Sequence, residues 1–178
     1  MSERPVPAYV DTRKVFQQEA EIAGAVPLQC LPRFRQSLAG DAAQVSVALA
    51  FTSNDSGQRL ITGVVRATVD VICQRCLEPL TIALEDEIRL ALVPGESEAA
   101  GLEPDLDPWI NEDYRLDLAP LVEEQLMLCM PIVSYHADGR CKEALSYRAG
   151  PDPETTQDAG EGVEENPFSV LKLLKKSD

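Results

Sequence analysis

The sequence predicts a single α+β domain in which an antiparallel β meander packs with a few helices, together with an acidic loop and a tethered C-terminal helix. Three observations predict this class. Residues 45–51, 61–73 and 81–93 place apolar side chains at every second position, which is typical of half-buried strands. Residues 117–129 repeat apolar side chains at helical spacing instead. The stretch 150–165 is rich in Gly, Pro and acidic residues, as a disordered linker is.

The remaining elements follow from turn and capping residues. Thr12 can cap a short helix over 13–22, which Gly24 then ends. The cluster of turn residues at 54–57 joins the first two strands of the meander as a hairpin. Residues 96–124 hold ten acidic side chains against one basic one and have no clean apolar period in their first part, which predicts an irregular acidic loop.

A helix then begins after Asp117, with Glu123 and Glu124 on its outer side, and Pro131 stops it. Residues 1–149 therefore form the predicted domain, residues 150–165 the acidic linker, and residues 166–178 a short amphipathic helix.

Composition indicates a soluble globular protein. The chain has 178 residues, of which 44% are apolar and 26% are charged. It has no stretch near the roughly 18 apolar residues that span a bilayer, and its first residues lack the apolar core of a signal peptide. Five cysteines, an odd number, fit reduced thiols better than a disulfide framework. We therefore expect a cytoplasmic protein that has no membrane partner.

Charge is distributed unevenly between the two halves of the chain. The formal net charge is −14; residues 1–80 carry eight basic and eight acidic side chains, whereas residues 81–178 carry eight basic and 22 acidic ones. An acidic surface disfavours non-specific binding to phosphate backbones, because that affinity comes largely from Lys and Arg. The balance favours a basic partner, or serves solubility alone.

Two pairs of side chains have the spacing of metal ligands. Cys73 and Cys76 stand two residues apart at the end of a predicted strand, and His136 and Cys141 bracket a turn-like segment. Three thiolates and one imidazole make a four-ligand structural zinc site. Two alternatives remain open, namely a redox dithiol at Cys73 and Cys76, and two cysteines that pack as small apolar residues. A lone histidine is often a surface or hydrogen-bonded residue.

A few basic side chains are candidates for contact with RNA or a partner. Arg33 and Arg35 flank Phe34, and such a cluster can stack on and pair with single-stranded RNA. Arg75, between the two cysteines, is expected to point outward, toward a phosphate, a carboxylate or solvent. The terminal helix offers Lys172, Lys175 and Lys176, although lysines at a helix C-terminus also suit the helix dipole.

The sequence holds no constellation typical of an enzyme. It has no Gly-rich phosphate loop and no nucleophile with a nearby histidine and orienting residue, and its carboxylates lie in acidic runs. We expect no catalysis and no small-molecule substrate.

Several segments together resemble one known family. They are Leu31–Phe34, Cys73–Cys76 at a strand end, the helix of residues 117–128 that leads to Pro131-Ile132-Val133, His136 with Cys141, and the terminal Asn166-Pro167-Phe168-Ser169-Val170-Leu171 followed by a short basic helix. The chain resembles, over about residues 10–176, the YceD family of bacterial and plastid proteins, formerly a domain of unknown function. The terminal segment, with Asn166, Pro167 and Phe168, is the most specific part.

The resemblance implies a non-catalytic role in the accumulation of large-subunit ribosomal RNA, and hence in ribosome biogenesis. Two partners follow as hypotheses. Either precursor RNA binds through Arg33, Arg35, Arg75 and the terminal lysines, or the acidic tract 96–124 shields a basic ribosomal protein. The charge balance favours the second. The alternative function is that of a small zinc-binding or thiol-redox protein that uses Cys73 and Cys76.

Overall fold

A long twisted β-sheet forms the frame of the molecule. The computed structural model describes residues 4–137 and residue 141. Its main sheet has five strands in the order β2-β3-β4-β5-β6. A second sheet of two strands pairs β1 with β7 in antiparallel register. In chain order the elements are β1 (Tyr9–Asp11), α1 (Thr12–Gln17), β2 (Glu21–Ala25), η1 (Leu28–Cys30), α2 (Pro32–Gln36), β3 (Ala43–Ser53), β4 (Arg59–Ile72), β5 (Pro79–Val93), α3 (Glu96–Ala99), β6 (Asp107–Ile110), β7 (Arg115–Asp117) and α4 (Leu118–Cys129).

The predicted α+β class is confirmed. Strands β2 to β5 are antiparallel neighbours that follow one another in sequence, and only β6 joins its neighbour β5 in parallel. The three predicted strands appear as β3, β4 and β5, each extended by two residues or more at one end or both. Their alternation holds because one sheet face is buried and the other is open.

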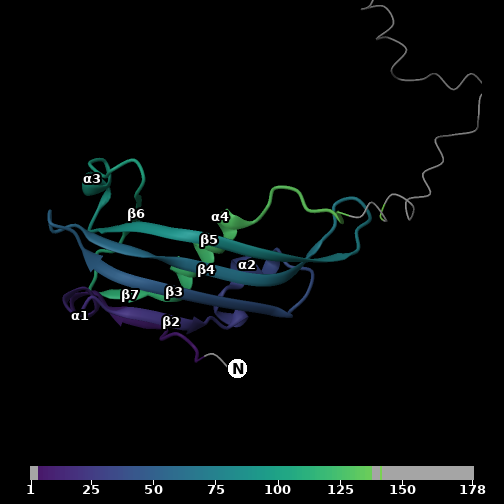
Figure 1. Cartoon of the computed structure of the whole chain (residues 1–178), viewed down its shortest axis with the longest axis horizontal. Helices are drawn as coiled ribbons and strands as arrows, with labels where there is room; N and C mark the ends of the chain where they lie inside the picture. The colour runs from purple at the N-terminus through teal and green to yellow at the C-terminus, as the bar shows by residue number, and fades with distance from the viewer. Residues whose placement is uncertain (1–3, 138–140, 142–178) are drawn as a thin grey trace, which may run out of the picture. The chain divides into compact units, whose positions relative to one another are not determined.

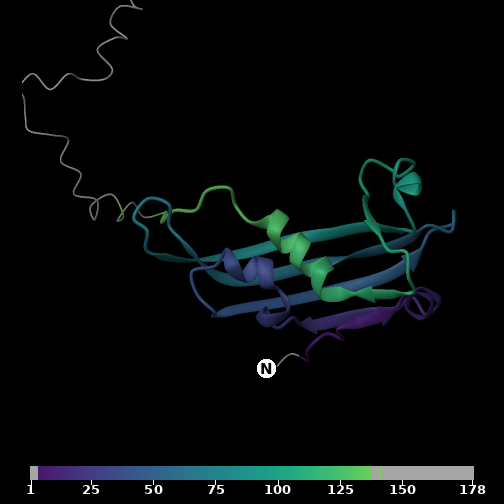
Figure 2. The ribbon, with the colours of Figure 1, turned by 180° about the vertical axis from the view of Figure 1, so that it is seen from behind.

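Helices α2 and α4 lie across the strands on the same face of the sheet (Figure 2). From α4, Leu118, Leu121, Val122 and Leu126 are buried against the apolar face of β4 and β5. That face contributes Ile61, Val65 and Ile88, each almost fully buried. Burial of this kind is worth roughly 1.5–3 kcal/mol for each large side chain, so this layer is the main source of stability.

Three predictions about local structure are wrong. The helix expected over 13–22 ends at Gln17. Residues Glu21–Ala25 form β2 instead and pair in antiparallel register with residues 46–50 of β3. Asp11, not Thr12, is its N-cap and accepts a hydrogen bond from the Arg13 N–H at 3.0 Å. The acidic loop over 96–124 contains the short elements α3, β6 and β7.

No helix in the part of the chain that the structure describes is long and apolar enough to span a membrane. The predicted linker over 150–165 and the predicted helix over 166–178 lie outside the described residues, so their boundaries stay predictions.

Candidate metal centre

The connection between β4 and β5 forms a tight turn that presents two cysteines. Cys73 is fully buried at the end of β4, continuing the buried parity of Val71. Its N–H donates to the Glu78 carbonyl at 2.9 Å, and its own carbonyl accepts from the Leu77 N–H at 2.9 Å. These two bonds close the turn, so Cys73 and Cys76 are held on one side of it.

The other two ligands come from the chain after α4. This segment returns to the turn, where the Ser134 carbonyl accepts from the Gln74 N–H at 2.9 Å. The Gln74 side-chain amide also donates to the Ile132 carbonyl at 3.4 Å. The turn and the segment around Ser134 are thereby joined by hydrogen bonds to backbone carbonyls, which brings His136 and Cys141 next to the two cysteines.

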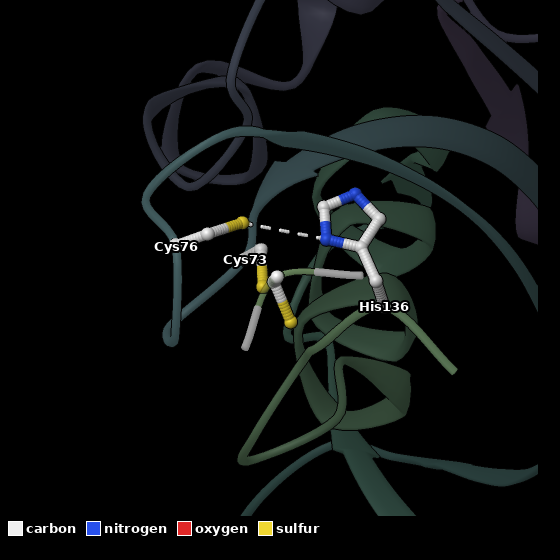
Figure 3. Close-up of side chains that lie close together, drawn as sticks. Cys73, Cys76 and His136 are labelled. Atoms are coloured by element: carbon white, nitrogen blue, oxygen red, sulfur yellow. Dashed lines mark hydrogen bonds between the residues drawn. The ribbon is translucent and has the colours of Figure 1, made fainter. Parts of the chain in front are cut away.

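All four predicted ligand side chains lie together, and Figure 3 shows His136 facing the thiols of Cys73 and Cys76. Their candidate ligand atoms are within 4.8 Å of one another. The Cys76 sulfur is 3.5 Å from the His136 Nδ1 atom. Zinc bonds of about 2.3 Å to sulfur and about 2.0 Å to nitrogen, at tetrahedral angles, put a sulfur and a nitrogen about 3.5 Å apart. The arrangement could therefore hold one tetrahedral ion.

The second nitrogen of His136 supports this role. Its Nε2 atom lies 3.3 Å from the Pro79 carbonyl oxygen. A proton on Nε2 donates to that carbonyl, which leaves the lone pair of Nδ1 free on the side of the Cys76 sulfur. A carbonyl partner of this kind commonly fixes the tautomer and the ring orientation of a metal-binding histidine.

Burial and hydrogen bonding act in opposite directions on the two thiols of the turn. Burial raises the pKa of Cys73, but hydrogen bonds from the backbone N–H groups of Cys76, Arg75 and His136 bring it down to about 6. Burial raises the pKa of Cys76, and the neighbouring Cys73 sulfur adds to that increase. This lowering of the pKa favours the thiolate form of Cys73, the form that binds a metal ion.

Arg75 lies inward, contrary to the expectation that it points away from the cysteines. Its Nη1 atom is 3.4 Å from the Cys141 sulfur, and its guanidinium carbon lies 4.8 Å from the centre of the Tyr135 ring. A cation beside a thiolate offsets part of the charge that three thiolates would gather there.

Comparison with known proteins identifies the family. The profile of the family described as "Large ribosomal RNA subunit accumulation protein YceD" matches residues 61–175. The chain belongs to the YceD family. A relative of that same name from Haemophilus influenzae is 29% identical over 99% of both chains. No solved structure matches. The predicted family is thus confirmed, and the matched region contains all four ligand residues.

Other predicted site residues of this YceD-family chain are placed differently. The Arg33 Nη1 atom pairs with the Glu124 Oε2 atom at 2.8 Å, and the Arg35 Nε atom pairs with the Asp41 Oδ1 atom at 2.7 Å. The predicted partner-binding residues of the terminal segment lie outside the described residues: Asn166, Pro167, Phe168, Lys172, Lys175 and Lys176.

Sequence reasoning also missed one buried charge. Glu123, expected on the outer side of α4, is 6% exposed. Its Oε1 atom accepts hydrogen bonds from the N–H groups of Arg33 at 2.7 Å and Phe34 at 3.1 Å. It thus caps the first turn of α2, a role that the helical period of α4 alone does not reveal.

Proposed function

We propose that this chain supports the accumulation of large-subunit ribosomal RNA as a non-catalytic factor in the cytoplasm, and that it does so by binding a basic ribosomal protein. The relative from Haemophilus influenzae carries this role in its name, and family membership supports its transfer. The observation that favours a protein partner is the charge distribution of the described residues.

Acidic side chains dominate the described surface. Residues 4–137 hold 20 Asp and Glu against ten Lys and Arg. Six of those ten basic side chains form ion pairs with carboxylates: Arg13, Arg33, Arg35, Arg66, Arg89 and Arg115. A neutralised arginine attracts phosphate weakly, so these pairs disfavour precursor RNA as the direct partner of Arg33 and Arg35.

The acidic charge is concentrated at one end of the sheet. We call residues 96–113 the acidic end; they carry seven carboxylates and no Lys or Arg. A shallow groove there is lined by three carboxylates, Glu98, Glu112 and Asp113, and by one basic side chain, Arg59. The apolar Leu92 and Leu102 lie beside them. An extended basic segment of a ribosomal protein fits such a surface, because opposite potentials raise the association rate and help to fix the binding register.

The test compares two variants of equal charge. In the first variant, Glu98 and Glu112 are replaced by Gln and Asp113 by Asn. In the control variant, Glu21 and Glu87 are replaced by Gln and Asp55 by Asn. Binding of purified basic large-subunit proteins is measured for both. We expect the first variant alone to weaken binding at least tenfold. Equal weakening by both variants would indicate non-specific attraction, and retained binding to ribosomal RNA but not to protein would favour the RNA hypothesis.

We also propose that Cys73, Cys76, His136 and Cys141 hold a structural zinc ion. Four protein ligands close the coordination sphere, so no position stays open for a substrate, which agrees with a non-catalytic role. Metal analysis of the reduced protein should give one zinc per chain, lost in Cys76→Ser and retained in Cys30→Ser, whose exposed thiol lies outside the cluster. Metal-free protein with reversibly oxidised Cys73 and Cys76 would favour the redox alternative.

A further inference from the structure

Exposed apolar side chains gather around the candidate metal centre. Nine large hydrophobic side chains are exposed in the part of the chain that the structure describes, and six of them come from two short segments that meet there. The six are Ile72, Leu77, Leu128, Ile132, Val133 and Tyr135. The hydrogen bonds from Gln74 to the Ser134 and Ile132 carbonyls join these two segments. Exposed apolar side chains that cluster on a surface are typical of interaction sites, whereas singly scattered ones are common on any protein.

Leu77 is the most informative member of this group. It stands directly after Cys76 with a φ of 64°, in the left-handed region that favours glycine. Its side chain is 74% exposed, so the core gains little from it. Leucine in this conformation carries backbone strain that glycine would not, and the exposed side chain is therefore better explained by contact with another molecule than by the fold.

We propose that Leu77, Ile132, Val133 and Tyr135, here called the knuckle surface, dock an apolar segment of a partner protein that is flanked by lysine or arginine. The inference rests on the proposed function, because it assigns a second contact to the same basic ribosomal protein. The zinc ion has an indirect role: it joins the turn to the segment after α4 and so holds the four side chains in one arrangement.

The charges around the knuckle surface select this partner. Glu78 follows Leu77 directly and is exposed. Among the described residues, the two segments that form the surface hold no basic side chain other than Arg75, whose guanidinium is taken up by the Tyr135 ring and the Cys141 sulfur. A loaded centre of three thiolates, a neutral imidazole and a divalent ion would carry one net negative charge, which the adjacent Arg75 guanidinium offsets. The exposed Glu78 carboxylate is therefore the unbalanced charge beside the surface. The edge of the knuckle surface at Glu78 therefore attracts basic side chains and repels phosphate.

The chemistry of the surface favours protein over RNA for a second reason. Single-stranded RNA binds through stacking of its bases on aromatic rings and through free cations. The knuckle surface offers one aromatic ring, already covered on one side by Arg75, and three aliphatic side chains. Leu, Ile and Val suit the apolar side chains of a protein segment better than they suit bases.

The knuckle surface and the acidic end can be tested separately. β5 begins next to the turn and ends next to α3, so the two lie at opposite ends of one strand (Figure 1). A strand of its length spans roughly 45–50 Å at about 3.3 Å per residue. Substitutions at one end therefore leave the contacts of the other end unchanged.

The experiment uses the full chain loaded with zinc, with a photo-crosslinking amino acid in place of Ile132, which is 95% exposed. The probe is the set of large-subunit proteins stripped from ribosomes with salt, with and without ribonuclease. A second version carries the crosslinker at Ala83 on the open face of the sheet, as a control. We expect a ribonuclease-resistant crosslink from position 132 alone, to a peptide with apolar residues flanked by Lys or Arg.

Leu77→Gly should reduce the yield of that crosslink at least tenfold without lowering the melting temperature. The control Tyr9→Ser removes an exposed ring outside the surface and should leave the crosslink yield unchanged. A crosslink to RNA, a crosslink to a second copy of this chain, or an unchanged yield in Leu77→Gly would each overturn the inference. If binding is lost on neutralising the acidic end but survives Leu77→Gly, only this inference fails. If no large-subunit protein is captured by crosslinking and none binds in the assay of the acidic end, the proposed function fails as well.

Discussion

Glu123 shows how one side chain can join two helices of this fold. Its carboxylate satisfies two N–H groups at the start of α2 that have no partner within the helix. Glu123→Ala leaves them buried without an acceptor, and we expect a loss of about 2–4 kcal/mol in the free energy of unfolding. Glu123→Gln keeps an oxygen in place and should lose about half as much. Urea unfolding measures both, and equal losses would show that packing, not the hydrogen bonds, matters here.

Leu77 should respond to substitution in the opposite way from a core residue. Glycine at its left-handed position relieves about 1 kcal/mol of backbone strain and costs a similar amount in unfolded-state entropy. We therefore expect Leu77→Gly to be neutral or slightly stabilising in thermal unfolding. Leu77→Val keeps an apolar side chain but adds a branch at Cβ, so it should destabilise by about 1–2 kcal/mol. A marked loss of stability in Leu77→Gly would assign the side chain a structural role.

At the scale of elements, the pairing of β3 with β4 depends on one glycine. A Cβ atom added to Gly63 would lie 2.0 Å from the Ala48 carbonyl oxygen, which is backbone and cannot move alone. Gly63→Ala should therefore destabilise by about 3 kcal/mol or more in urea unfolding, because the strands must separate to admit it. The matched control is Gly40→Ala, where nothing lies within 4 Å of the added atom. That variant should be neutral or gain up to about 1 kcal/mol.

An ion at the candidate metal centre would join the β4–β5 turn to the segment after α4, so metal removal should act on those parts first. We expect chelation to raise amide hydrogen exchange at least tenfold in residues 73–78 and 130–137, because without the ion the segment is joined to the turn by weaker contacts such as the two Gln74 hydrogen bonds. Exchange in β3 and β4 should change little, since their core is complete without the ion. Cys76→Ser should show the exchange pattern of the chelated protein without added chelator. Uniform exchange throughout the chain would show that the ion stabilises the whole fold.

The elements that sequence predicted well are those whose burial is periodic over many residues. β4 alternates over 14 residues and α4 repeats over 12, so each pattern is read without knowledge of neighbours. β2 and β6 have five and four residues, and the Gly and Ala of β2 have little strand preference of their own. They form because β3 and β5 offer edges to pair with, which is a property of the tertiary structure.

The candidate site, too, was predicted from the sequence only in part. Ligand types and local spacings pointed to Cys73, Cys76, His136 and Cys141, because such spacings are set by turn geometry. Their convergence depends on the Gln74–Ser134 contact, which joins residues 60 positions apart. The inward direction of Arg75 and the ion pairs of Arg33 and Arg35 depend on neighbours that are not adjacent in sequence, so only the tertiary structure could correct the prediction of free arginines.

At the scale of the whole molecule, the long sheet separates an acidic end from an apolar knuckle surface. If one basic protein binds both, the two contacts act as linked sites, and their separate losses should add in the free energy of binding. The two should also differ in salt dependence. Raising the salt concentration from about 50 to about 200 mM weakens the contact with the acidic end by screening, while apolar contact at the knuckle surface is affected little.

The prediction is therefore a four-way comparison of wild type, the neutralised acidic end, the Leu77→Gly and Ile132→Ser double variant, and their combination. Affinity for the captured ribosomal protein is measured at both salt concentrations. We expect the neutralised protein to bind more weakly and with a shallower salt slope, the double variant to bind more weakly with the wild-type slope, and the combination to lose the sum of both in log Kd. A combined loss no larger than either single loss would mean that the two ends do not engage one partner at the same time. The sheet would then be a spacer between two separate interactions.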